Sequence, residues 1–134
     1  MRNFFAAVIA VAVLPAAVNA QSYQAVNRLN VIPLERSVFE VIQTRGEGPR
    51  GIWCAAAEYA ERRLGATGRI YIQKPRGAAQ RVKGRKSVTF TTDAGRLSQG
   101  PSQSISLSIT QVGVGLPVAH AIQFCRRVDY EINS

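Results

Sequence analysis

The sequence predicts an α+β domain, in which an antiparallel sheet of about five strands carries two helices on one face. The expected order is β-β-α-β-β-β-α, closed by one disulfide. Three observations predict this class. Short β-branched or alternating segments are bounded by Gly and Pro, as in antiparallel sheets. Two other stretches carry apolar residues at helical spacing. Each of these two stretches contains one of the two cysteines, Cys54 and Cys125.

The first twenty residues have the pattern of an export signal. Arg2 is followed by the uncharged run Phe4–Leu14, and Val18–Ala20 places small side chains where a signal peptidase cuts. The run is shorter than the roughly twenty residues that cross a bilayer, which disfavours the alternative of a retained membrane anchor. The residue directly after the expected cut is Gln21 and not a cysteine, so a lipid-anchored form is not expected. We therefore expect a periplasmic or secreted bacterial protein.

Removal of residues 1–20 leaves 114 of the 134 residues. This length suits one domain with a modest core. We expect a polar, disordered lead-in over residues 21–28 and a single domain over residues 29–134. No later segment is apolar enough to span a membrane, so the mature form should have no transmembrane span.

Two strands are expected before the first helix. Leu29–Ile32 is a short apolar segment that Pro33 should stop. Ser37–Ile42 is rich in β-branched and aromatic residues, which favours a strand. Residues 34–45 also place four apolar side chains on one helical face, so a helix there is the alternative.

The first helix is expected over Ile52–Leu64, after a turn over Gly46–Gly51. Gly65 stands where a left-handed helix cap belongs. One stripe at helical spacing contains Trp53, Ala56, Ala57, Ala60 and Leu64. Its alanines allow the helix axis to lie close to a sheet.

Three strands are expected next. Arg69–Gln73 should end before Pro75, and Ser87–Thr92 alternates in polarity. Between them, Gly77–Lys86 has the composition of a basic loop. Ser104–Thr110 alternates serine or threonine with isoleucine or leucine and is the clearest strand pattern in the chain.

The second helix is expected from Pro117, which suits the first turn of a helix. Its apolar face should contain Val118, Ala121, Ile122, Cys125 and Val128. Because both helices must cover the same sheet face, a bridge from Cys54 to Cys125 is geometrically plausible. An exported protein folds where thiols oxidise, and two cysteines allow one pairing. Such a bridge should stabilise the fold by about 4 kcal/mol.

The segment Ile52–Ala60, with its Trp-Cys pair, and the later Ile70–Ile72 carry a resemblance. Over residues 38–125 the chain resembles small signal-bearing exported proteins of alphaproteobacteria, in which a Trp-Cys pair and a late cysteine recur. That group has no assigned activity. The resemblance therefore implies export and a disulfide, and it implies nothing about chemistry.

A thiol hydrolase is the enzymatic alternative. Cys54 near a helix start would be the nucleophile and His120, the one histidine, would be the base. The helical pattern argues against this site, because His120 projects from the polar side of its helix, away from Cys125. One histidine and two cysteines are also too few for a closed zinc site. We expect no catalytic residues, no metal and no cofactor.

The basic stretch is the one feature that points to a ligand. The chain has 17 Lys and Arg against 8 Asp and Glu, a net charge of +9. Between Lys74 and Lys86 there is no acid, and the candidate anion-binding residues are Lys74, Arg76, Arg81, Lys83, Arg85 and Lys86. Because Arg outnumbers Lys 14 to 3, part of this charge can reflect codon usage, and a solvated loop is the simpler interpretation.

The leading hypothesis is an exported, non-enzymatic binding domain that contacts anionic envelope components or an acidic protein through this loop. A nucleic-acid partner is not expected, because export separates the protein from nucleic acid and no aromatic residue lies between Lys74 and Lys86. A third hypothesis is a subunit or inhibitor that docks through a Ser/Thr-rich sheet face or an edge strand.

Overall fold

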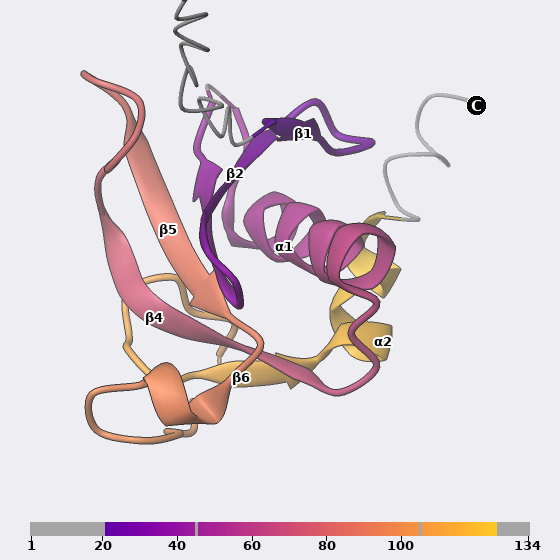
Figure 1. Cartoon of the computed structure of the whole chain (residues 1–134), viewed down its shortest axis with the longest axis vertical. Helices are drawn as coiled ribbons and strands as arrows, with labels where there is room; N and C mark the ends of the chain where they lie inside the picture. Colours follow the sequence, from indigo (N-terminus) through magenta and orange to yellow (C-terminus); the bar gives the residue numbers. More distant parts are fainter. Residues whose placement is uncertain (1–20, 45, 105, 126–134) are drawn as a thin grey trace, which may run out of the picture.

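The computed structural model describes residues 21–44, 46–104 and 106–125. The predicted export signal over residues 1–20 lies outside the described residues, as does Val128. Within the described part, the chain forms an α+β domain with one antiparallel sheet and two helices (Figure 1). The predicted fold class is confirmed, with six strands rather than about five.

The strands follow one another in the sheet in the order β1-β2-β3-β5-β4-β6. Their bounds are β1 Tyr23–Gln24, β2 Asn30–Glu35, β3 Val38–Ile42, β4 Arg69–Ala78, β5 Lys86–Thr91 and β6 Gly115–Pro117. The helices are α1, Pro49–Leu64, and α2, Val118–Ala121, and a 3-10 turn, η1, spans Ala94–Arg96. The strand over residues 38–42 excludes the alternative helix over residues 34–45.

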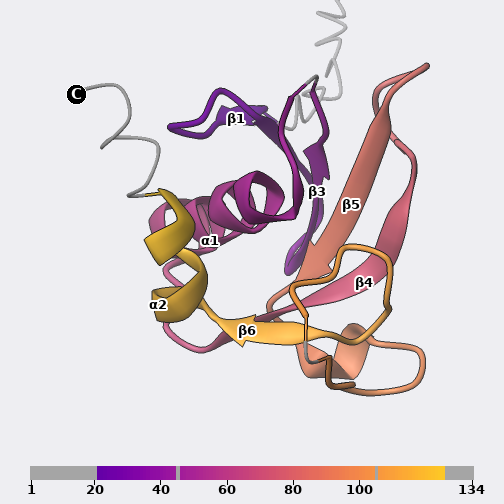
Figure 2. The same ribbon diagram turned by 180° about the vertical axis from the view of Figure 1, so that it is seen from behind.

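The core lies between α1 and the concave face of the sheet (Figures 1 and 2). Trp53, Phe39 and Phe90 are fully buried there. Every residue from Gly51 to Ala60 is buried, because the small alanines let α1 sink against the strands. Gly65 has a φ of 62° and closes the helix in the left-handed conformation that its position predicts.

The segment before β2 differs from the disordered lead-in predicted for residues 21–28. It contains β1 and a turn, because α1 supplies partners for its polar groups. The carboxylate of Glu58 accepts the backbone N–H of Val26 at 2.8 Å, and the side-chain amide of Asn27 donates to the carbonyl of Gly51 at 2.8 Å. Tyr23 packs edge-on against Tyr59, with ring centroids 5.8 Å apart.

Two strands continue through prolines that were predicted to end them. In β2, Pro33 lies opposite Phe39, beyond the reach of β1, which pairs only with Asn30 and Val31. In β4, Pro75 lies inside register shifts between Ile72 and Gly77. A proline lacks only a donor, so an open edge or a bulge can accommodate it. Three residues of the predicted basic loop, Gly77, Ala78 and Lys86, therefore belong to the strands of a β4–β5 hairpin.

The described residues of the segment 104–110, which leave out Ile105, form no strand, although this pattern was the clearest. Its serines bond to the nearby backbone instead: the Ser104 hydroxyl donates to the Ser106 carbonyl at 2.8 Å, and the Thr110 N–H donates to the Ser108 hydroxyl at 3.1 Å. Such local bonds compete with a strand ladder. Ile109 is nevertheless buried, as the alternation predicts, and its carbonyl accepts the N–H of Arg76.

The edge of β4 is covered by the chain that leads into β6, a strand that was not predicted (Figure 2). Pro117 is the last residue of β6 and not part of the helix that follows. The second helix, α2, is interrupted at Ile122, after which residues 123–125 are helical again and the N–H of Cys125 donates to the Ile122 carbonyl. The rest of the predicted helix lies outside the described residues. Cys125 still reaches α1. The predicted Cys54–Cys125 disulfide is confirmed, with Cα atoms 5.0 Å apart.

Candidate functional site

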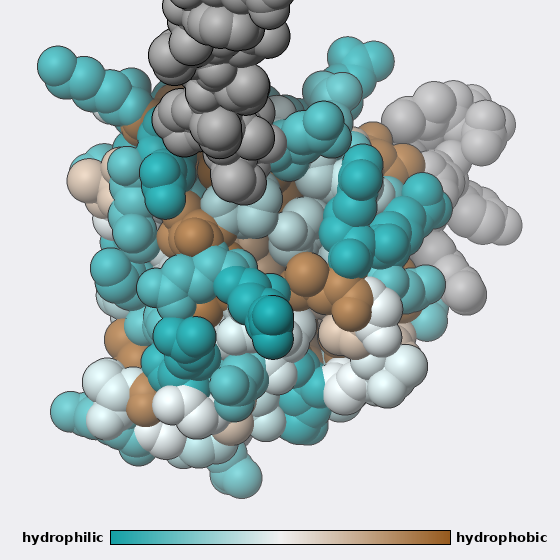
Figure 3. All heavy atoms as spheres, in the orientation of Figure 1, coloured by the Kyte–Doolittle hydropathy of each residue, from teal (hydrophilic) through white to brown (hydrophobic). Residues whose placement is uncertain are grey.

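The β4–β5 hairpin carries the predicted basic residues. Lys74 and Arg76 lie on β4, Lys86 begins β5, and Arg81, Lys83 and Arg85 lie between the strands. All six side chains are exposed. The tip of the hairpin projects from the molecule in Figure 1, and hydrophilic side chains project at the same place in Figure 3.

In the described part of the chain, the six cations of the hairpin form no ion pair. Among the described residues, the ion pairs are Arg62–Glu58 and Arg96–Glu35, and neither involves one of the six. The six cationic groups therefore remain available to an external anion.

A buried carboxylate holds the basic loop in place. Glu40, in the middle of β3, has no solvent exposure. Its two oxygens accept the backbone N–H groups of Gln80 at 2.9 Å and Arg81 at 3.0 Å, and the Ser87 hydroxyl at 3.1 Å. These three charge-assisted bonds fix the start of the loop against the sheet. The first residues of the loop are thus bonded to the sheet, while its cationic side chains are exposed.

Near the loop end of the hairpin, three of the cations line one hollow of about 340 Å³. They are Arg76, Arg85 and Lys86, and the opposite wall is the turn after β3, with Gln43 and Glu47. The Gln43 side chain joins the two walls: its oxygen accepts the Nε–H of Arg76, and its amide donates to the Glu47 carbonyl at 3.0 Å.

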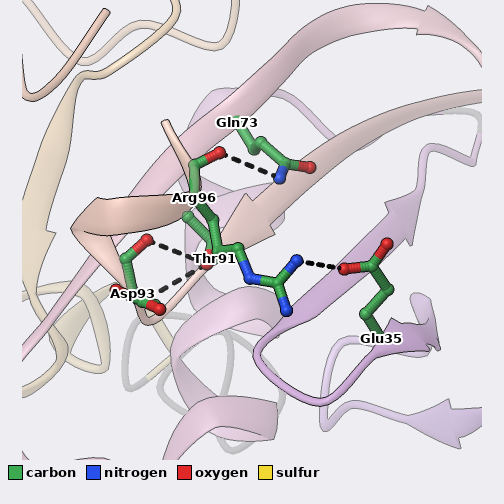
Figure 4. A network of polar contacts seen from close by, with 5 residues as sticks. All are labelled: Glu35, Gln73, Thr91, Asp93 and Arg96. Carbon is green, nitrogen blue, oxygen red and sulfur yellow. Dashed lines mark hydrogen bonds and ion pairs between the residues drawn. The ribbon is translucent and has the colours of Figure 1, made fainter. Parts of the chain in front are cut away.

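A second hollow, of about 410 Å³, lies between the β2–β3 turn, β4 and the chain after η1. Lys74 lines it together with Arg96 and Glu35, whose side chains form an ion pair of 2.7 Å across it (Figure 4). The backbone of Arg96 is held as well, since its carbonyl accepts the Gln73 amide at 3.2 Å. The hairpin thus divides these cations between two hollows, with Lys74 in this one and Arg76 and Lys86 in the other.

The residues of the thiol-hydrolase alternative are not arranged for catalysis in this structure. The sulfur of Cys54 is bonded to Cys125, and both cysteines are buried. His120 is exposed and packs edge-on against Phe124, with ring centroids 5.8 Å apart. It lines a hollow of about 390 Å³ with Arg69 and several serines. With its sulfur in a disulfide, Cys54 offers no thiolate.

No group of three or more His, Cys, Asp or Glu side chains that could hold a metal ion occurs among residues 21–44, 46–104 and 106–125. In the same residues, no helix combines the length and the hydrophobicity that crossing a membrane requires.

Two residues of the site were missed from the sequence, Glu40 and Gln43. A single acid inside the apolar run Val38–Ile42 was a usable signal, because a strand that buries both faces must give a carboxylate partners. Gln43 carried no signal, since its role depends on which part of the chain returns beside it.

Comparison of the chain with protein-family models, with curated proteins and with solved structures finds no match.

Proposed function

We propose that the protein is an exported, non-enzymatic binding domain that contacts phosphate-bearing components of the bacterial envelope through its β4–β5 hairpin. The observation that carries the proposal is the set of six exposed, unpaired cations on a hairpin that Glu40 holds in place. The backbone that carries these cations is already folded, so binding requires little further ordering. Less of the favourable binding free energy is then offset by lost conformational entropy.

Export is the second part of the proposal. The signal-like pattern of residues 1–20 supports it, as does the resemblance to exported alphaproteobacterial proteins. The Cys54–Cys125 disulfide also supports it, because disulfides persist mainly in oxidising compartments. An anionic envelope surface is the polyanion that such a protein would meet first.

The test is sedimentation with phosphatidylcholine vesicles that contain a fixed fraction of phosphatidylglycerol, at low and moderate salt. The wild type should bind, and the binding should weaken as salt rises. A hairpin variant replaces four cations by serine, namely Arg81, Lys83, Arg85 and Lys86. At about 1 kcal/mol for each basic residue near an anionic surface, the variant should bind up to roughly a thousandfold more weakly.

A matched control removes the same number of charges from elsewhere on the surface, by serine at Arg36, Arg50, Arg62 and Arg63. Its net charge equals that of the hairpin variant, so the comparison separates the position of the charges from their number. The control should retain most of the binding. Equal losses of vesicle binding in the two variants would show that the hairpin is not the contact surface.

A further inference from the structure

We infer that the hollow lined by Arg76, Arg85 and Lys86 binds a single phosphate monoester group. This inference rests on the proposed function and deepens it, because it assigns a ligand group and a discrete position to one part of the hairpin. A dispersed cationic surface would attract any anion, whereas a formed hollow discriminates among anions by charge and shape.

The register of the hairpin brings the cations together. Lys86 lies opposite Ala78 on the neighbouring strand, and Arg76 is two residues before Ala78. Arg76 lies within the register shift between Lys74 and Gly77, where the strand departs from regular alternation, and it lines the same hollow as Lys86. Gly84, with a φ of 79°, allows the turn that places Arg85 beside them.

The hollow is built from two walls that are tied to each other. The N–H of Gln43 donates to the Lys86 carbonyl at 2.9 Å, which fixes the turn after β3 beside the start of β5. The Gln43 side-chain oxygen accepts from Nε of Arg76. This bond orients the guanidinium through one nitrogen and leaves its two Nη groups without a partner among the described residues. A guanidinium held in this way is suited to a bidentate contact with phosphate oxygens.

The charge of the hollow selects the class of phosphate. The described residues that line it include three cations and one carboxylate, Glu47. That carboxylate lies against the first turn of α1, because a Cβ at Gly51 would overlap it. The net charge of these described lining residues is +2. A phosphate monoester carries about −1.5 to −2 at neutral pH, whereas a phosphodiester carries only a single charge. The monoester is the closer match.

The volume of the hollow, about 340 Å³, lies within the range of small-ligand sites, roughly 300–1,000 Å³. It can therefore take a phosphate together with the group that carries it. Phosphorylated sugars and phosphatidic acid both carry such a monoester group, and free phosphate has a similar charge and similar oxygens. The experiment therefore has two arms, one for soluble ligands and one for lipids.

The lipid arm compares vesicles of phosphatidic acid with vesicles of phosphatidylglycerol, at matched surface charge. The wild type should bind phosphatidic acid roughly tenfold more tightly, the effect of one additional hydrogen bond to a charged group. Gln43→Ala, which frees the guanidinium of Arg76, should abolish this preference while leaving salt-dependent binding to both vesicles. A double variant of Arg81→Ser and Lys83→Ser, outside the hollow, should weaken both and keep the preference.

The soluble arm follows the amide resonances of Gln43, Gly84 and Lys86 by NMR during titration with inorganic phosphate and with glucose 6-phosphate. Saturable shifts in the wild type that Gln43→Ala removes would support the site even if vesicles did not bind, in which case the proposed function alone would fail. Equal affinity for the two vesicles, with no saturable shift, would overturn the site and leave the proposed function standing. Thermal unfolding of each variant checks that its stability equals that of the wild type.

Discussion

Replacement of Glu40 tests whether the hairpin is held by a buried carboxylate. Glu40→Ala removes the acceptor of three hydrogen bonds of 2.9 to 3.1 Å. The backbone N–H groups of Gln80 and Arg81 then lose their partner in a partly buried place. At about 1–3 kcal/mol for each orphaned donor, together with the cavity that the side chain leaves, the free energy of unfolding should fall by about 3–5 kcal/mol.

Glu40→Gln is the sharper variant, because it keeps the volume of the side chain. One of its two terminal atoms becomes a donor and then faces a loop N–H, that of Gln80 or that of Arg81, because each oxygen of Glu40 accepts one of them. The loss should be about 2 kcal/mol, close to one unsatisfied polar contact. The assay is chemical denaturation at neutral pH, with hydrogen exchange of the Gln80 and Arg81 amides as the local measurement. Both amides should lose protection in Glu40→Ala.

The control is Glu61→Gln, on the exposed side of α1, where a change in stability of less than about 0.5 kcal/mol is expected. The reasoning is refuted if Glu40→Ala behaves like this control, with both loop amides still protected. The variant should also weaken vesicle binding through loss of order in the hairpin, without removing any cation.

Three further perturbations probe how the rest of the molecule is held to α1. Alanine at both Cys54 and Cys125 should lower the free energy of unfolding by about 4 kcal/mol, because the bridge closes a loop with a sequence separation of 71 residues, and denaturation with and without reductant measures this. Trp53→Phe removes the bond of 3.0 Å from the indole N–H to the Ser108 carbonyl and part of a buried ring, so a loss of about 2 kcal/mol is expected in the same assay. Burial raises the pKa of Tyr59 above its ordinary value of 10.0, an effect that the nearby Arg63 partly opposes. The neutral phenol is then the form that the fold favours, so its contribution is complete below about pH 10 and is lost as pH rises through the folded pKa, and Tyr59→Phe should flatten the fall of the melting temperature on the alkaline side.

Each of these expectations has a result that contradicts it. A reductant that leaves wild-type denaturation unchanged would show that the bridge contributes little. A full retention of stability in Trp53→Phe would mean that the indole bond does not hold the Ser108 segment. An alkaline profile that is the same with and without the Tyr59 hydroxyl would assign the alkaline loss to other groups.

Elements that depend on local pattern were predictable from the sequence. The alanine-rich stripe and Gly65 define most of α1, and the apolar runs define β3 and β5. The disulfide followed from there being two cysteines in the two expected helices. Of the candidate site, the six basic residues were predicted, and the structure places them on one hairpin.

What failed depends on competition between local and distant partners. Ser104–Thr110 alternates as a strand does, but its hydroxyls bond to the nearby backbone, and period alone does not reveal that outcome. The strand was predicted to end before Pro75, but it continues through the proline. A strand accommodates a proline at a bulge, and a bulge is a property of two paired strands that one strand's sequence does not reveal. Glu40 and Gln43 gain their roles from chain that returns some forty residues later, a separation at which a single sequence carries no pairing information.

The short outer strands of the sheet have a consequence for self-association. In the described part of the chain, the sheet ends in β1, with two residues, and β6, with three. The part of β2 that β1 does not cover is an edge of the sheet, and it contains Pro33 and the charged residue Glu35. Borders of this kind offer few free backbone groups to another copy, which opposes fibrillar stacking of the folded protein. The proposed binding to a charged surface would bring copies close together, and these short outer strands would then oppose their pairing edge to edge.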